Sequence, residues 1–522
     1  MKTRTKLALI ILGAFAFRAL LAALFVRFPG IADSNHYTNM ALRLLDGHGF
    51  TIDYIWQFNV PPASLIHPEE HWMPLAAVLA AIPMALFRTA EGVFNPASLL
   101  LFMISGALLP VVAFWAARQM KLTDQAALFS AGAAAFLPEL VLNSVRTDTT
   151  VPTALFVGVA VLAFVEGIRR GGARWYVLSG VATGLAYLTR NDALLLFPGF
   201  LVWGVLVWWA GRRGWVERPH LRGALLVPVV TLLVVSPWLV RNWQAFGALT
   251  SPETSDMFFF TDNLDHYAFG RDFTLQTMLA AQTPGQIIGK RLFEAAAGVK
   301  VTLEMLGGFL AVAVPGGLLL LWARKDRQRL LTIALPLILF FGVFVAYAVF
   351  IPYKAQAGSL KKGVLMLLPL LLPLGAYAVQ EAVTDKRIRS GVMALALALL
   401  AFGAVDLVRL DGDKAAGYLE SMRLMAAEAQ TLPDTNSDGE LRFMAQDPFM
   451  LRFVGLHSIM YPHEDLDTTL DIARRYGIDY LLFPAGRPQF AAIEAGLVSD
   501  PRLTPAGNVP GANYWFLRVE PN

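Results

Sequence analysis

Long apolar runs separated by short polar segments dominate most of this chain. A helix that crosses a bilayer needs about 20 mostly apolar residues. The sequence predicts about eleven such helices, near residues 7–27, 97–118, 124–140, 149–168, 175–189, 193–210, 222–240, 299–322, 329–350, 360–381 and 390–410. A further apolar run at 73–87 is shorter and contains Pro74 near its start.

The distribution of Lys and Arg indicates how these helices are oriented. If the N-terminus is cytoplasmic and 73–87 does not cross, the cytoplasmic loops are 118–121, 169–174, 211–223, 322–329 and 384–390, and each of them is basic. Cytoplasmic loops of membrane proteins carry an excess of Lys and Arg. We therefore expect about eleven spans, within a range of roughly 10–13, with 73–87 as a juxtamembrane or re-entrant helix.

The tail of the chain has a different pattern from the apolar runs. It predicts helices at 415–430 and 467–478, and strands at 441–446, 479–483 and 514–519. Strands that alternate with helices are typical of a small α/β domain. We therefore expect a transmembrane domain over 1–410 and an extracytoplasmic α/β domain over 411–522.

Composition agrees with a polytopic α-helical membrane protein. The chain is 56% hydrophobic and only 16% charged, whereas soluble domains carry about 25% charged residues. It contains no cysteine, which excludes disulfides and thiolate metal sites. The net charge of +4 is small, and nothing in the sequence indicates nucleic-acid binding.

Polar groups gather in the predicted outer loops rather than inside the spans. Arg18 is the only charged residue near the centre of a predicted span. Ion-coupled transporters usually place ionisable groups or broken helices at mid-membrane. A polar site on one face of an apolar bundle is better suited to an enzyme that takes a lipid-linked substrate from the outer leaflet.

Asp33 follows the first span and precedes a short amphipathic helix. The apolar positions of that helix have helical spacing and are expected to lie on the lipid: Tyr37, Met40, Ala41, Leu44 and Leu45. Asp33 has two interpretations. It could cap the helix at 34–45, or it could be a carboxylate held at the membrane surface to deprotonate a hydroxyl.

Asp148, in the string RTD, ends the third predicted span on the same face as Asp33. Two carboxylates from separate loops could hold a divalent cation, such as Mg or Mn, or divide the roles of base and orienting group. The alternative is a surface ion pair between Arg146 and Asp148 combined with a helix cap.

Two strings resemble metal sites. HPEEHWMP (67–74) has two His four residues apart, but its Pro and Glu residues also fit a helix start. We favour Glu70 and His71 as residues that line the site. DTNSDGE (434–440) resembles the start of a calcium loop, yet the twelfth position is Ala445 instead of Glu, which favours a solvated turn.

Four cationic residues project toward the outer interface in this topology: Arg190, Arg241, Lys361 and Lys362. Interfacial Arg and Lys often only extend toward lipid headgroups. Convergence of several from distant segments would instead suit an anionic phosphate.

These motifs, in this order, resemble the GT-C glycosyltransferases, specifically the dolichyl-phosphate-mannose-protein mannosyltransferase-like and lipid A aminoarabinose transferase-like branch. The resemblance covers roughly residues 1–380. It is carried by ADSNHYTNMALRLLDGHGF, HPEEHWMPLAAVLAAIPMALF, SVRTD, GLAYLTRNDALLLFP, SPWLVRNWQAFG and GSLKKGVLMLLPLLLPLGAYA.

The resemblance implies an inverting transferase in the inner membrane that uses a polyprenyl-phosphate sugar as donor and a protein, lipid or polysaccharide as acceptor. Asp33 would be the catalytic base and Asp148 the second acid, possible ligands of a divalent cation. The donor phosphate would meet Arg190, Arg241, Lys361 or Lys362, and the site would also be lined by Asn35, Tyr37, Glu70 and His71. Many relatives have Asp-Glu in the first loop, whereas Ser34 follows Asp33 here.

Two alternatives belong to other classes. A polyprenyl-lipid transporter or flippase would need polar groups inside the spans, and these are scarce. A non-catalytic scaffold with an outer α/β domain would leave the polar loops unexplained.

Overall fold

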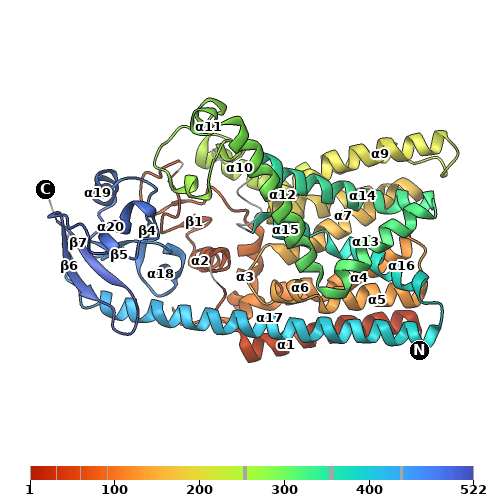
Figure 1. Cartoon of the computed structure of the whole chain (residues 1–522), viewed down its shortest axis with the longest axis horizontal. Coiled ribbons are helices and arrows are strands. Elements are labelled where there is room, and N and C mark those ends of the chain that lie inside the picture. Colours follow the sequence, from red (N-terminus) through yellow and green to blue (C-terminus); the bar gives the residue numbers. More distant parts are fainter. Residues whose placement is uncertain are drawn as a thin grey trace.

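An elongated molecule has a helical bundle at one end and a small α/β domain at the other (Figure 1). The computed structural model describes residues 2–30, 32–58, 60–90, 92–250, 256–351, 358–435 and 439–520. Residues 436–438, in the middle of DTNSDGE, lie outside these ranges, so the turn predicted there stays a prediction.

The bundle accounts for most of the chain. Its helices are α1 (Thr3–Phe25), α4 (Leu100–Gln119), α5 (Asp124–Phe136), α7 (Thr150–Arg170), α8 (Ala173–Thr189), α9 (Leu196–Arg212), α10 (Leu226–Phe246), α12 (Pro284–Leu306), α13 (Gly308–Ala323), α14 (Arg327–Val345), α15 (Ser359–Leu365), α16 (Leu368–Ala382) and α17 (Lys386–Ala429). Among the described residues, seven helices are long and apolar enough to cross a membrane, or nine if each of two bent pairs is one span. The chain is a multi-pass membrane protein, as predicted.

The expected count of about eleven spans is not confirmed. The runs at 124–140 and 175–189 form α5, with 13 residues, and α8, with 17 residues. Both are shorter than the roughly 20 residues that a span needs. The helix α5 ends at Phe136, because Pro138 disfavours helical geometry at Leu137, whose ψ is 121°.

Two other predicted spans are broken rather than straight. The run at 299–322 divides between α12 and α13, which meet at 110°. Gly307 lies between them with φ of 69°, a conformation that favours glycine. The run at 360–381 divides into α15 and α16, which meet at 60°.

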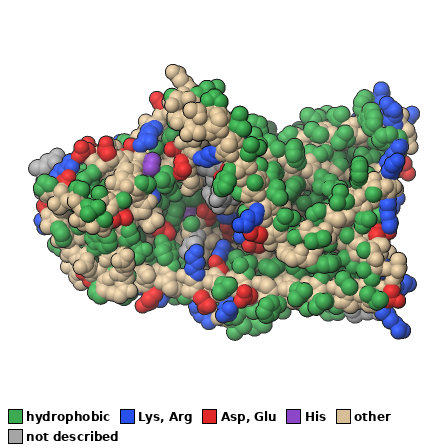
Figure 2. Space-filling view, viewed as in Figure 1, with side chains coloured by type: hydrophobic (Ala, Val, Ile, Leu, Met, Phe, Trp, Pro, Cys, Tyr) green, Lys and Arg blue, Asp and Glu red, His purple; other side chains and the backbone are tan. Residues whose placement is uncertain are grey.

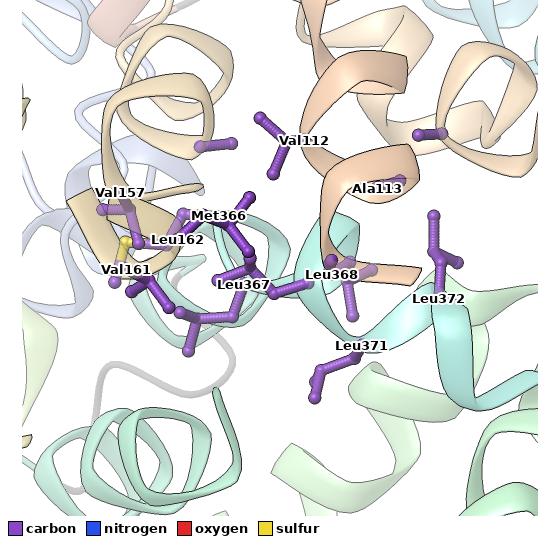
Figure 3. Packing of buried hydrophobic residues seen from close by; sticks show 14 of the residues in the cluster. Val112, Ala113, Val157, Val161, Leu162, Met366, Leu367, Leu368, Leu371 and Leu372 are labelled. Carbon is purple, nitrogen blue, oxygen red and sulfur yellow. The ribbon is translucent and has the colours of Figure 1, made fainter. Parts of the chain in front are cut away.

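The break between α15 and α16 is packed deep in the bundle (Figure 3). Leu367 and Leu368 lie at the break and contact a cluster that includes Val157 and Val161 of α7 and Val112 of α4, all nearly fully buried. Because protein interiors are close-packed, this contact fixes the position of the short helix α15.

The first outer loop contains two short helices, α2 (Asp33–Leu45) and α3 (Leu75–Leu86), and a hairpin of β1 (Thr51–Ile52) with β2 (His67–Pro68). With 12 residues, α3 is too short to cross, as expected for 73–87. The expected lipid contact of α2 is wrong. Met40 and Ala41 are fully buried and pack in one cluster with Ala77 and Ala80 of α3.

The α/β domain is built on one five-stranded sheet of order β4-β3-β5-β7-β6. Its elements are β3 (Arg442–Ala445), α18 (Pro448–Phe453), β4 (His457–Met460), α19 (Leu466–Arg475), β5 (Tyr480–Phe483), α20 (Ala491–Glu494), β6 (Leu503–Asn508) and β7 (Trp515–Val519). β3 is parallel to β4 and β5, whereas β7 is antiparallel to β5 and β6. The predicted strands correspond to β3, β5 and β7. The sequence analysis predicts neither β4 nor β6, and β6 contains Pro505 and Gly507, which weaken a strand pattern.

The α/β domain is joined to the bundle in two ways. The helix α17 passes residue 411, the predicted domain boundary, without a break over its 44 residues. The first outer loop also extends the sheet: Ile55 forms a parallel bridge with Ile459, and the amide of Met460 donates to the Ile55 carbonyl at 2.7 Å. Trp56 and Phe58 belong to the same apolar core as the domain.

Lys and Arg side chains crowd the end of the bundle farthest from the α/β domain (Figure 2). The helix α9 ends at Arg212, and α13 is followed by Arg324 and Lys325. This distribution matches the basic loops predicted at 211–223 and 322–329. The α/β domain and the first outer loop therefore lie at the opposite end from the basic loops.

Candidate functional site

A cavity of about 490 Å³ opens between the bundle and the α/β domain. The surface is hollowed there, with charged side chains around it (Figure 2). Charged lining residues are Asp33, Arg190, Asp192 and Lys362. Aromatic and imidazole lining residues are Tyr37, Trp56, His71, Trp72, Phe258, His266, Tyr267, Tyr347 and Phe449.

Asp33 is the first residue of α2, and its side chain caps nothing. The residue in the N-cap position is Ala32, and the helix has no side-chain cap hydrogen bond. Instead, Oδ2 of Asp33 accepts a hydrogen bond from Nζ of Lys362 at 2.7 Å. The side chain is 38% exposed. Of its two interpretations, the helix cap is therefore wrong, and the carboxylate faces the cavity.

Asp148 lies directly behind this ion pair. Its Oδ2 accepts from Nζ of the same Lys362 at 2.5 Å, while its Oδ1 accepts from the amide of Thr150 at 2.7 Å. Only 5% of its side chain is exposed. The alternative pairing with Arg146 is wrong, because Arg146 pairs with Asp411 of α17.

A set of short hydrogen bonds holds the two carboxylate-bearing segments together. The hydroxyl of Thr147 donates to the carbonyl of Ser34 at 2.6 Å, and the hydroxyls of Thr38 and Thr147 lie 2.9 Å apart. These contacts tie the first turn of α2 to the segment that precedes α7. Ser34 follows Asp33 and Thr147 precedes Asp148, so the hydrogen bond between these two buried residues brings the carboxylates together.

The ammonium group of Lys362 controls the protonation of both carboxylates. Burial alone would raise the pKa of Asp33, but the positive charge of Lys362 outweighs it, and the pKa lies below its ordinary value. The pKa of Asp148 is also lowered: burial raises it, and Lys362 and Thr150 more than compensate. Both groups are therefore carboxylates at neutral pH.

Arg190 lines the cavity, but its charge is already matched. Its guanidinium donates to both carboxylate oxygens of Asp192, at 2.7 to 3.2 Å. The hydroxyl of Tyr347 donates to the same carboxylate at 2.9 Å. Arg190, predicted from the sequence, thus lines the cavity, whereas Tyr347, which bonds the carboxylate of Asp192, comes from a predicted span in which no site residue was expected.

The two other predicted cations do not line the cavity. Lys361 pairs with Glu139 of α6 (Pro138–Leu142) at 2.6 Å. Arg241 donates to the carbonyls of Phe50 and Glu69, both at 2.6 Å, and so secures the hairpin of the first loop. In this structure each of the two residues makes a structural contact with the protein instead of facing the cavity.

Of the four residues predicted to line the site, Tyr37 and His71 do so, whereas Asn35 and Glu70 do not. Asn35 is fully buried and contacts the sulfur of Met450 in α18. Glu70 pairs with His67 at 3.3 Å and does not line the cavity, whereas His71 does. Tyr37 also lines it, although only 2% of the residue is exposed.

A buried polar chain supports the part of the first loop that faces the cavity. In the fully buried pair His36 and Glu69, Nε2 of the imidazole lies 3.2 Å from Oε2 of the carboxyl group, and Nδ1 of His36 lies 2.7 Å from the hydroxyl of Tyr54. Glu69 also accepts from the amides of His71 and Trp72, each at 2.7 Å. Sequence analysis assigned Glu69 only to a helix start, because its role depends on a partner 33 positions away.

Part of the chain matches a family of known proteins. Residues 67–241 match the family model described as dolichyl-phosphate-mannose-protein mannosyltransferase. No curated protein matches the sequence.

Solved structures match over nearly the whole chain. ArnT from Cupriavidus metallidurans, bound to undecaprenyl phosphate, has a TM-score of 0.60 at 15% identity, over 99% of each chain. The archaeal oligosaccharyltransferase AglB from Archaeoglobus fulgidus, in complex with an inhibitory peptide and a dolichol-phosphate, has a TM-score of 0.55 at 12% identity, over 92% of this chain and 69% of that one. The same Archaeoglobus fulgidus enzyme in complex with zinc and sulfate has a TM-score of 0.56 at 14% identity, over 91% and 67%.

This protein has the GT-C fold. The match covers the bundle and the α/β domain alike, since the alignment with ArnT extends over 99% of this chain. The GT-C fold implied by the sequence motifs is therefore confirmed, and the family model matches within the predicted range, over residues 67–241.

The residues of this GT-C site do not fit a divalent cation. Among the residues that the structure describes, no group of three or more His, Asp or Glu side chains could hold a metal ion. The ammonium of Lys362 lies between Asp33 and Asp148, where such a cation would bind. The expectation that these two carboxylates hold Mg or Mn stays a prediction, and the positive charge of Lys362 between them argues against it.

Proposed function

We propose that the chain is an inverting glycosyltransferase that moves a sugar from a polyprenyl-phosphate donor to an acceptor hydroxyl. The observation that carries the proposal is Asp33, an ionised carboxylate on a membrane-associated cavity, hydrogen-bonded to Lys362 through one oxygen. Among the described residues, none donates to its other oxygen, Oδ1. Undecaprenyl phosphate in the ArnT structure and dolichol-phosphate in the AglB structure support the class of donor.

In the proposed reaction, the acceptor hydroxyl attacks the anomeric carbon on the face opposite the phosphate. Its proton passes to Oδ1 of Asp33, and the bond between the anomeric carbon and the phosphate oxygen breaks. The electron pair leaves with that oxygen, which gives the polyprenyl phosphate and a glycoside of inverted configuration. A positioned base of this kind contributes roughly a hundred- to ten-thousand-fold.

Lys362 provides positive charge where the leaving phosphate becomes more negative. Charge placed where it develops stabilises the transition state more than the ground state. Asp148 holds the ammonium from behind and so orients it toward the cavity. For the donor, we propose a sugar linked to polyprenyl phosphate. For the acceptor, we propose a hydroxyl group on a protein, a lipid or a polysaccharide.

We place the cavity and the α/β domain on the extracytoplasmic side of the inner membrane. The basic end of the bundle supports this orientation, because basic loops remain in the cytoplasm. A reporter that is active only in the cytoplasm, fused after Asn522, should be silent. If it is active, the orientation is wrong.

The test of the function is transfer by the purified full chain. Undecaprenyl-phosphate-linked sugars should serve as donors, and polyprenyl phosphate should be released in step with the glycoside. Comparison of envelope glycans from a deletion strain and its parent, by mass spectrometry, would identify the acceptor. Failure to bind any polyprenyl phosphate would contradict the proposal.

A polyprenyl-lipid transporter or flippase is not favoured by the interior of the bundle. Arg18 is buried in α1, and it donates to the carbonyls of Ala14 and Ala135 and to the hydroxyl of Ser144, at 2.8 to 3.1 Å. These bonds join α1 to its neighbours. The polar cavity described above lies at one end of the bundle instead of along a path through it.

A further inference from the structure

Three charged groups at the floor of the cavity form one hydrogen-bonded unit. Nζ of Lys362 lies 2.7 Å from Oδ2 of Asp33 and 2.5 Å from Oδ2 of Asp148. The two carboxylates come from segments more than a hundred positions apart, and Lys362 comes from a third, α15. Only 23% of the lysine side chain is exposed.

Two carboxylates that converge on one positive centre are the usual protein contribution to a magnesium or manganese site. Here the positive centre is an ammonium group. The second oxygen of Asp148 is already occupied by the amide of Thr150, which leaves this pair short of ligands for a divalent ion that prefers about six oxygens.

We propose that Lys362 is the resident cation of the site and takes the place of a divalent metal ion. Its ammonium holds Asp33 and Asp148 together, and it also binds the phosphate of the donor. Transfer by this chain therefore requires no divalent metal. The proposal rests on the proposed function.

The donor count of the ammonium supports this assignment. An ammonium has three N–H groups. Two of them reach the carboxylates, so one remains for a phosphate oxygen. Among the described residues, Arg190 is the other lysine or arginine that lines the cavity. Its Nε and Nη2 donate hydrogen bonds to the carboxylate of Asp192. Lys362 therefore keeps one N–H for a phosphate oxygen, directly beside the proposed base Asp33.

The backbone of α15 is built to hold this lysine in place. Gly363, the next residue, is buried against α14, where an added Cβ would lie 2.7 Å from a methyl of Val343 and 3.1 Å from the ring of Tyr347. The close approach of α15 to α14 and the packed break at Leu367 leave the helix little freedom to shift.

The first experiment uses the wild-type chain, purified and treated with a chelator. Binding of undecaprenyl phosphate and the rate of sugar transfer are measured with EDTA and again with added Mn²⁺. The affinity and the transfer rate should each differ by no more than about twofold between the two conditions. A tenfold change in affinity would correspond to the loss of a charge-assisted contact. Loss of binding or transfer with EDTA, restored by Mn²⁺, would overturn the proposal.

Electron paramagnetic resonance of added Mn²⁺ gives a readout independent of activity. The wild-type spectrum should show no stoichiometric bound Mn²⁺. A bound signal that disappears in Asp33→Asn would place a metal at this position and refute the assignment of Lys362 as the resident cation.

The second experiment compares two adjacent lysines. Lys362→Gln should weaken undecaprenyl phosphate binding by roughly 10- to 100-fold, the range expected for a lost hydrogen bond to a charged group. Lys361→Gln is the matched control, because this lysine pairs with Glu139 away from the cavity, and it should bind like the wild type. Equal affinities of the two variants would overturn the proposal.

These outcomes separate the inference from the function on which it depends. A wild-type chain that transfers sugar but needs Mn²⁺ would leave the glycosyltransferase intact and refute the role of Lys362. A wild-type chain that binds no polyprenyl phosphate under any condition would refute the function itself.

Discussion

The charged and the aromatic parts of the cavity lining are held in place by different forces. Asp33 is the first residue of α2 and Lys362 lies in the short helix α15, and the two are fixed by ion pairs and hydrogen bonds. Trp56, Trp72 and Phe449 come from the first loop and the α/β domain, with ring centroids 4.4 to 6.2 Å apart. The charged part therefore depends on a few polar contacts, whereas the aromatic part depends on the docking of the α/β domain. Substitutions in the two parts should have different consequences.

The largest effect is expected in the charged part. Asp33→Asn should lower turnover by roughly a hundred- to ten-thousand-fold, because an amide cannot accept the proton of the acceptor. The melting temperature should change little, since Asp33 caps no helix and its ion pair is partly exposed. Transfer rates and thermal melting of the purified variant check both statements. Transfer at the wild-type rate would assign the base to another residue, with Asp148 the next candidate.

Substitutions in the aromatic part should lower the stability of the protein more than they lower the rate of transfer. Phe449→Ala removes a buried ring that contacts Trp72 and Tyr54, and a substitution of this kind costs about 3–5 kcal/mol. We expect a clear fall in the temperature at which the α/β domain melts, measured by circular dichroism. Phe449→Leu is the control, because it keeps most of the apolar volume. A normal melting temperature in Phe449→Ala would show that the domain docks without this contact.

The pH dependence of transfer separates the effects of charge and burial on Asp33. In the wild type, Lys362 holds the pKa of Asp33 below its ordinary value of about 3.9. The base stays ionised as pH falls, until pH reaches that lowered pKa. In Lys362→Met, burial remains and the opposing charge is gone, so the pKa should rise. The acid limb of the pH profile for residual transfer should move to higher pH. An unmoved limb would mean that Asp33 does not titrate in this profile.

The smallest effect on transfer and melting is expected for a substitution just outside the cavity, at Arg146. Arg146→Gln breaks the pair with Asp411 at a partly exposed position, and such pairs contribute about 0–1 kcal/mol. Transfer should stay near the wild-type rate, and melting should change slightly. A large loss of transfer would show that the contact between this segment and α17 also positions Asp148.

The sequence predicted the outline of the fold well, and its errors have identifiable causes. Apolar runs predict helices because backbone groups in a bilayer must bond within their own segment. They do not show where a helix is broken, and Gly307 divides one predicted span while Pro138 shortens another. The apolar stripe of α2 was recognised from its spacing, but it was assigned to the lipid instead of to the protein interior. The pattern alone could not distinguish lipid from the neighbouring helix α3 as the surface that covers it.

For the candidate site, the sequence by itself identified the residue types and the segments that carry them. Asp33, Asp148, Arg190 and Lys362 all stand out in the sequence, because charged groups beside an apolar span are costly and therefore informative. Only the tertiary structure separated Lys362 from Lys361. The two occupy adjacent positions on a helix, about 100° apart, so one turns to the carboxylates and the other to Glu139. The direction of a side chain depends on how its helix packs, and in α15 that packing is set by residues on α7, α12 and α14, which only the folded chain brings together.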